Sequence, residues 1–167
     1  MRKFIPFLLM LMISLAMHAQ KQTYSNVKEG VSFTYPSKFQ KSSIQSASHM
    51  LLKLESGNQT IALSKWNYGL DASYTIWNEE IVQLTKENVR RTGASLISID
   101  KRYLNTTQGK KKALVSIVNM RQNNMHAVTY QFLHKGDLWQ IVIANSGTYN
   151  KALLSTYDDY IGGLSLK

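Results

Sequence analysis

The chain has 167 residues, no cysteine and a formal net charge of +10 at neutral pH. The lack of cysteine excludes disulfides, thiol catalysis and membrane attachment through an acylated cysteine. A basic chain of this length suffices for one domain core, and its charge points to self-repulsion in solution or to an acidic partner.

Residues 1–19 have the pattern of a secretory signal peptide. Two positive charges precede an uncharged apolar run from Phe4 to Met17, which is shorter than the roughly 20 residues of a membrane-spanning helix. Cleavage after Ala16 and cleavage after Ala19 both fit. We expect an exported chain, periplasmic or secreted, with no transmembrane anchor after cleavage; an uncleaved anchor is the alternative.

The next segment, residues 20–29, is polar and lacks periodicity, so it predicts a flexible N-terminal arm. A single domain is then expected over residues 30–167. Its first strand runs from Gly30 to Tyr35, where apolar residues alternate with small polar ones, and Pro36 ends the alternation.

Two further strands and a helix follow along the chain. Runs at 49–55 and 59–66 flank a Ser-Gly-Asn turn and predict a hairpin. Trp77, Ile81 and Leu84 recur at helical spacing, and Gly93 is the expected end of that helix. Asp71 or Ser73 is the expected N-cap.

The region 94–146 predicts an antiparallel meander with Gly or Asn in its turns. We expect three long strands here and six in the whole chain. The strand-like runs of this region are 95–104, 111–121, 125–134 and 138–145. Apolar residues lie on both faces of these strands, so helices must cover both faces.

A second helix is expected from Tyr149 to about Ile161, with Thr148 as its cap and two glycines after its end. Residues 164–167 predict only a packed tail. The expected fold class is therefore α+β: an α/β/α sandwich with a mostly antiparallel six-stranded sheet covered by helices on both faces.

The strand G-V-S-F-T-Y-P at 30–36, the order of elements after it and the ending Y-I-G-G-L-S-L at 160–166 resemble the PsbP-like superfamily. That superfamily includes the PsbP subunit of photosystem II, the envelope protein DcrB and a nuclear Ran-binding factor. The resemblance implies a sandwich used for docking, without a shared catalytic centre. Pro36 and Phe39 look like the corner at the end of the superfamily's first strand.

No catalytic, cofactor-binding or metal-binding constellation is predicted, so we expect no enzyme and no cofactor. His126 and His134 are eight residues apart on one predicted strand, about 26 Å, which is too far to share a metal. Both histidines are expected at exposed or capped strand ends. The couplets Glu79-Glu80 and Asp158-Asp159 are expected on solvated helix surface, because adjacent helical residues do not face each other.

Basic residues gather where two turns of the meander meet at one end of the sheet. This predicted rim is the candidate contact surface for an anionic partner. A charged edge that only blocks strand pairing is the alternative. The rim comprises Lys101, Arg102, Lys110, Lys111, Lys112, His134 and Lys135.

Two aromatic residues at a strand exit, Trp66 and Tyr68, are the candidates for exposed aromatic side chains. The favoured function is docking onto an unknown protein or a polyanionic envelope component, and export disfavours nucleic acid as the partner. The alternative is a small-ligand carrier with a pocket between sheet and helix, near Trp66 and Tyr68.

Overall fold

The computed structural model describes residues 20–43, 48–71, 74–120 and 123–167. The expected signal peptide, residues 1–19, lies outside these ranges, as does the candidate N-cap Ser73.

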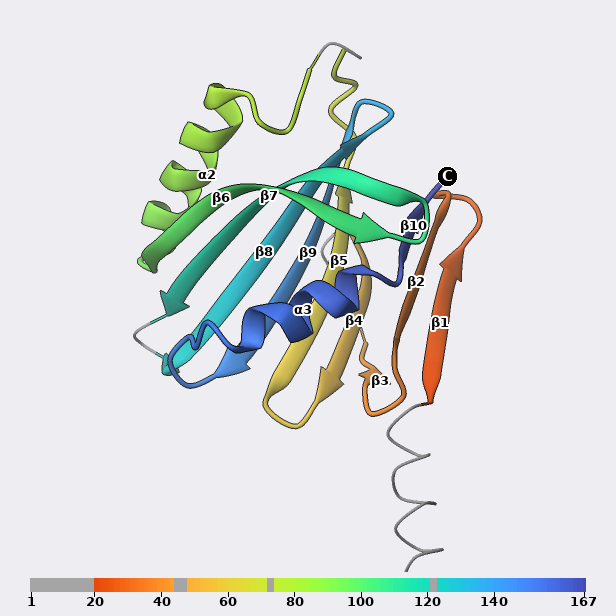
Figure 1. The fold of residues 1–167 in the computed structure, drawn as a ribbon, viewed down its shortest axis with the longest axis horizontal. Coiled ribbons are helices and arrows are strands. Elements are labelled where there is room, and N and C mark those ends of the chain that lie inside the picture. The colour runs from red at the N-terminus through yellow and green to blue at the C-terminus, as the bar shows by residue number, and fades with distance from the viewer. Residues whose placement is uncertain (1–19, 44–47, 72–73, 121–122) are drawn as a thin grey trace, which may run out of the picture.

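Two antiparallel sheets and two helices make up the described residues (Figure 1). The larger sheet has seven strands in the order β3-β4-β5-β9-β8-β7-β6, and the smaller has three in the order β1-β2-β10. The α+β class and the antiparallel pairing are confirmed, whereas the count of six strands is wrong. The bounds are β1 Lys21–Asn26, β2 Val31–Pro36, β3 Gln40–Lys41, β4 Met50–Ser56, β5 Gln59–Trp66, α2 Glu79–Arg91, β6 Ser95–Thr106, β7 Gly109–Met120, β8 Met125–His134, β9 Asp137–Ser146, α3 Leu153–Ile161 and β10 Leu164–Leu166.

Ten strands are present where six were expected, and the four extra ones are one strand of the meander, β1, β3 and β10. Each of the four meander runs forms its own strand, β6 to β9. The expected flexible arm instead forms β1, which pairs with β2 from Lys21 opposite Pro36 to Asn26 opposite Val31. The expected tail forms β10 on the other side of β2. β1 is polar and lacks an apolar alternation, and β10 has only three residues, so the alternation in β10 is a weak signal.

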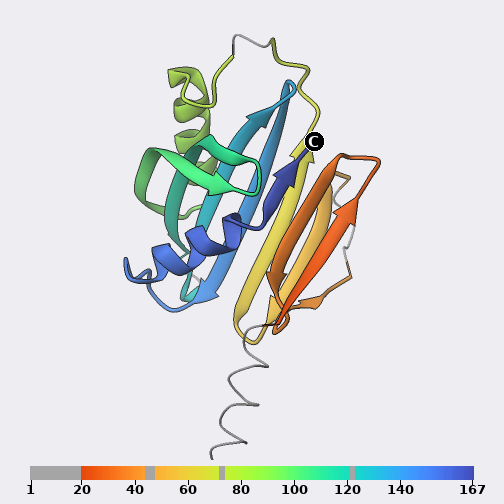
Figure 2. The same ribbon diagram turned by 45° about the vertical axis from the view of Figure 1, so that its right-hand side comes forward.

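The main core lies between the large sheet on one side and α3 with the small sheet on the other (Figure 2). Alternation in β2 buries Val31, Phe33 and Tyr35 against the large sheet. Tyr157 and Ile161 of α3 are fully buried in the same cluster. This face is therefore covered by a helix and a sheet, where two-sided helical cover was expected.

The opposite face of the large sheet is covered by α2 over part of its width. Val82 of α2 and Ile76 before it pack on Leu114 of β7. Farther along the sheet, Val142 and Ala144 of β9 are only half-buried, so the two-sided cover is confirmed only in part.

Both helices begin later than expected. Asn78 caps α2, and its side-chain oxygen accepts the backbone N–H of Glu80 at 3.0 Å. The preceding residues form turns instead, with Asn78 N–H donating to Thr75 O at 2.9 Å. The first turn of α3 follows Ala152, whose N–H donates to the side chain of Asn150 at 2.9 Å. In both cases an asparagine supplies the acceptor for N–H groups at the helix start.

Gly163 joins α3 to β10 where the two backbones approach closely. Thr34 N–H donates to Gly163 O at 2.9 Å. A Cβ at position 163 would clash with the carbonyl oxygen of Thr34. Glycine at this position therefore allows β10 to pair with β2.

We predict that Gly163→Ala lowers the free energy of unfolding by about 2 to 3 kcal/mol, because strand β10 must move away from β2. The measurement is chemical denaturation of the purified chain. Gly162→Ala is the matched control, since Gly162 has helical dihedrals and its nearest new contact, Asp159 O, lies at 3.1 Å. That control should lose less than about 1 kcal/mol. Equal losses in the two variants would contradict the explanation.

Candidate functional site

The predicted basic rim is divided by the alternation of side chains along β6 and β7. In this hairpin Tyr103 lies opposite Lys112 and Asn105 lies opposite Lys110. Lys112 reaches the ring of Trp77 next to α2, at 5.0 Å from its centroid. Lys111 is on the other face, opposite the buried Leu104. The three consecutive lysines therefore serve two different surfaces.

Two members of the predicted rim are engaged in ion pairs. Arg102 donates to both carboxylate oxygens of Asp158 in α3, at 3.3 and 2.6 Å. Lys101 lies on the opposite face and approaches Glu79 of α2 at 3.7 Å. The structure therefore does not bring these two residues together, because their side chains extend to opposite sides of β6.

Four chain segments meet at one end of the molecule, close to the label of the C-terminus (Figure 1). Thr107 in the β6–β7 turn donates to Leu164 O from both its N–H, at 3.1 Å, and its hydroxyl, at 2.9 Å. Lys167 N–H donates to Gly30 O, in the β1–β2 turn, at 2.7 Å. The β8–β9 turn joins them through Lys65, which pairs with Asp137 at the start of β9.

Lys65 neutralises both carboxylates that belong to these turns. Its Nζ lies 3.0 Å from Glu29 Oε2 and 3.1 Å from Asp137 Oδ2. Five other lysines at this end have no ion-pair partner within the described ranges. We call this group the basic end: Lys28, Lys110, Lys111, Lys135 and Lys167.

Sequence reasoning missed Lys28 and Lys167 as members of the basic end. Lys167 is brought there by β10, and Lys28 by the β1–β2 turn. The signal that could have found them is the alternation Leu164-Ser165-Leu166, which fits a short strand.

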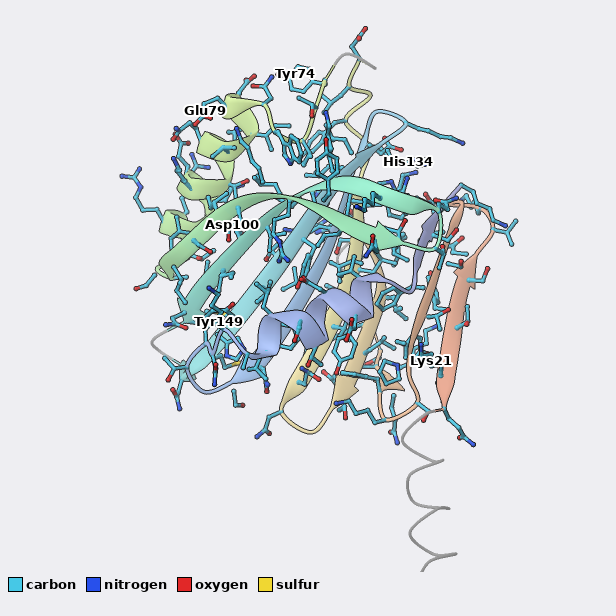
Figure 3. All side chains as sticks on the ribbon, viewed as in Figure 1. Lys21, Tyr74, Glu79, Asp100, His134 and Tyr149 are labelled. Atoms are coloured by element: carbon cyan, nitrogen blue, oxygen red, sulfur yellow. The ribbon has the colours of Figure 1, made fainter. Side chains whose placement is uncertain are left out.

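His134 lies near the β8–β9 turn at this end, and its side chain is half-buried (Figure 3). Its Nε2 is buried and has no hydrogen-bond partner among the described residues. Burial lowers the pKa of His134, and the positive charges of Lys111 and Lys135 lower it further. His134 therefore stays neutral near neutral pH and adds no charge to the basic end.

A polar cluster beneath α3 is the strongest alternative site, and it corrects two expectations. Asp158 is not solvated helix surface, because it accepts Tyr130 OH at 2.9 Å in addition to Arg102. Burial and the neighbouring Asp158 raise the pKa of Tyr130 far above its usual value, so Tyr130 remains a hydrogen-bond donor.

His126 is also buried, not at an exposed strand end. Its Nδ1 lies 2.9 Å from Gly147 O and its Nε2 lies 3.0 Å from Tyr157 OH. Both ring nitrogens of His126 and the hydroxyl oxygen of Tyr157 therefore have protein partners. The cluster therefore fastens α3 to the sheet, and it offers no free general base.

A groove of about 290 Å³ lies between α2 and the end of the large sheet. Tyr68 is 58% exposed and stands at its edge. Trp66 does not line the groove, because its ring stacks on His49 with the centroids 4.6 Å apart. Five of the eleven residues that line it are leucine or isoleucine: Leu70, Ile81, Leu84, Leu133 and Leu138.

Within the described ranges, no group of three histidine, aspartate or glutamate side chains is arranged to hold a metal ion. No helix in those ranges is long and apolar enough to cross a membrane.

We predict that His134 makes the protein less stable as the pH falls. The unfolded histidine titrates near 6.5 and the folded one below that value. Its contribution to stability is therefore complete above pH 6.5 and is lost as the pH falls toward the folded pKa. Denaturation at about pH 7.5 and about pH 5.5 should show a smaller loss in His134→Gln than in the unaltered chain. An equal loss in both would show that other groups cause it.

No family model matches the sequence, and no curated protein matches it. Several solved structures are similar in fold. Cyanobacterial PsbP (CyanoP) from Synechocystis aligns at a TM-score of 0.65 and 15% identity, over 89% of this chain and 94% of that one. A Bacteroides thetaiotaomicron protein aligns at 0.52 and 11% identity, over 89% of this chain and 49% of that one.

A Pseudomonas aeruginosa protein of unknown function, PA94, aligns at 0.50 and 11% identity, over 89% of this chain and 99% of that one. At these identities the likeness concerns the fold alone. The fold of this chain is therefore similar to that of cyanobacterial PsbP.

Proposed function

We propose that this chain is a non-enzymatic accessory protein that docks onto an acidic protein or polyanionic partner through the basic end. The observation that carries the proposal is the pairing of Lys65 with both Glu29 and Asp137. Because this pairing uses the carboxylates of the adjoining turns, the five lysines of the basic end keep their charges available to a partner.

The arrangement of the basic end supports docking more than catalysis. Lysine is a flexible point charge that attracts an anionic surface without requiring a fixed geometry. The lysines come from two turns, from the start of β7 and from position 167, and hydrogen bonds hold these segments together as a unit. Their attraction extends over about 10 Å at 0.1 M salt, so it favours encounter with a large acidic surface.

Export is part of this proposal. The pattern of residues 1–19 favours a leader, and an extracytoplasmic chain meets acidic envelope polymers and acidic protein surfaces. Without Arg2 and Lys3 the chain has 18 lysine and arginine residues against 10 aspartate and glutamate residues. A mature chain with this formal charge of +8 would be attracted to both.

We predict that replacing Lys28, Lys111 and Lys135 by Ser weakens binding to an anionic matrix. The slope of log affinity against log salt should fall by about two to three, because each lysine in contact with a polyanion releases about one counterion. The measurement is retention on sulfonated and polyglutamate matrices at several salt concentrations.

The matched control carries the same loss of charge at scattered sites. Lys21, Lys86 and Lys151 are exposed, lie away from the basic end and have no ion-pair partner within the described ranges. Their replacement by Ser should reduce the slope by less than one. If both triple variants elute alike, net charge alone governs binding and the docking proposal fails.

The groove beside α2 supports a second candidate function, the carriage of a small apolar molecule. Its volume of about 290 Å³ is at the small end of ligand sites, so it suits a small apolar molecule. Gln131 closes its floor, and its side-chain oxygen accepts the hydroxyl of Thr85 at 3.2 Å. The groove then offers an apolar wall with a few polar groups for orientation.

We predict that the neutral dye N-phenyl-1-naphthylamine binds in this groove and that Leu84→Ser weakens binding about threefold to tenfold, because apolar contact area is lost. Leu96→Ser is the control, since Leu96 is 39% exposed and lies outside the groove, whereas Leu84 is 51% exposed. The measurement is the fluorescence of the dye. Equal effects in the two variants, or no enhancement at all, would remove the carrier hypothesis.

A further inference from the structure

One face of the β6–β7 hairpin carries an exposed aromatic ring among lysines. Tyr103 of β6 is 59% exposed. Its cross-strand neighbour on β7 is Lys112. Lys101 lies two residues earlier on the same face of β6, and Lys110 lies opposite Asn105 on the same face of β7. We call these residues, with Trp77, the tyrosine–lysine patch.

Trp77 fixes the geometry of this patch. Its indole N–H donates to Ala113 O at 2.8 Å, which holds the ring against β7. The rings of Trp77 and Tyr103 meet edge to face, with centroids 4.9 Å apart and planes at 80°. Lys112 Nζ lies 5.0 Å from the centroid of Trp77. The phenol ring of Tyr103 is thus supported from within the protein and remains accessible from outside.

The charges around the ring are positive and mostly free. Lys110 and Lys112 have no carboxylate partner among the residues that the structure describes. The contact of Lys101 with Glu79 is long, at 3.7 Å, and both side chains are substantially exposed, so it is easily exchanged for another anion. A ligand on Tyr103 would therefore meet two or three ammonium groups.

We propose that the tyrosine–lysine patch binds an anionic polysaccharide. The apolar face of one sugar ring packs on Tyr103, and the acidic groups of this sugar and its neighbours pair with Lys110 and Lys112. This inference rests on the proposed docking function and names the chemical class of the partner. Lys110 belongs to both surfaces, so a polymer on the patch continues onto the basic end.

The exposed ring distinguishes a polysaccharide from other polyanions. An acidic protein surface needs lysines but has no need of an exposed phenol ring between them. Single-stranded nucleic acid stacks successive bases on successive ring faces. Here the ring of Trp77 is nearly perpendicular to that of Tyr103, and Lys112 lies over the ring of Trp77. Tyr103 is therefore the one ring of the patch on which a ligand can stack.

The test compares three polyanions on the full chain: polygalacturonate, poly-L-glutamate and a poly(dT) oligonucleotide. We expect Tyr103→Ala to weaken binding of polygalacturonate about tenfold, in line with the loss of one stacked ring. Binding of poly-L-glutamate should be unchanged, because it depends on the lysines alone. Tyr103→Phe keeps the ring and should restore polygalacturonate binding.

Tyr68→Ala is the matched control, since Tyr68 is equally exposed but lies at the α2 groove. It should leave all three affinities unchanged, and thermal denaturation checks that each variant is folded. Equal weakening of polygalacturonate and poly-L-glutamate by Tyr103→Ala would overturn the inference, and so would strongest binding to poly(dT). An unchanged polygalacturonate affinity would also overturn it.

The basic-end variant separates this inference from the docking proposal. If Lys28, Lys111 and Lys135 replacement weakens poly-L-glutamate binding while Tyr103→Ala changes nothing, docking stands and the polysaccharide assignment falls. If the lysine replacements change nothing for any polymer, docking itself falls, and the inference that rests on it is overturned with it.

Discussion

The pairing of β10 with β2 is the contact on which the rest of the structure depends. It joins the end of the chain to its first strands and closes the three-stranded sheet over one face of the large sheet. The close approach at Gly163 makes this pairing possible, because a side chain there would meet Thr34. Since α3 leads directly into β10, the same contact also positions α3 over the core, where Tyr157 and Ile161 are buried.

The basic end follows from this closure. Without β10, Lys167 and the β1–β2 turn would not lie beside the β6–β7 turn, to which Thr107 ties them through Leu164. Lys65 then joins the small sheet to the β8–β9 turn by bridging Glu29 and Asp137. One interaction network thus fixes the geometry and removes local negative charge, and both effects favour an acidic partner.

The two faces of the β6–β7 hairpin have separate roles. Arg102 faces inward and, together with Tyr130, binds Asp158, which secures α3. The opposite face presents Tyr103 among lysines, with Trp77 as its support. A single hairpin can therefore stabilise the fold on one face and carry the proposed binding patch on the other, because successive side chains point to opposite faces.

The sequence by itself determined the α+β class, the long antiparallel strands and the superfamily resemblance, because these depend on local periodicity and on turn residues such as Gly136. It also predicted a contact surface of basic residues near the meander turns, which stays a prediction. Tertiary structure decided which of them remain free: Arg102 is paired by a carboxylate 56 residues away, and burial keeps His134 neutral. It likewise made strands of residues 21–26 and 164–166, whose short sequences gain their partners only when distant segments pair. Ion pairing, burial and strand pairing are long-range effects, and the spacing of residues along a chain does not encode them locally.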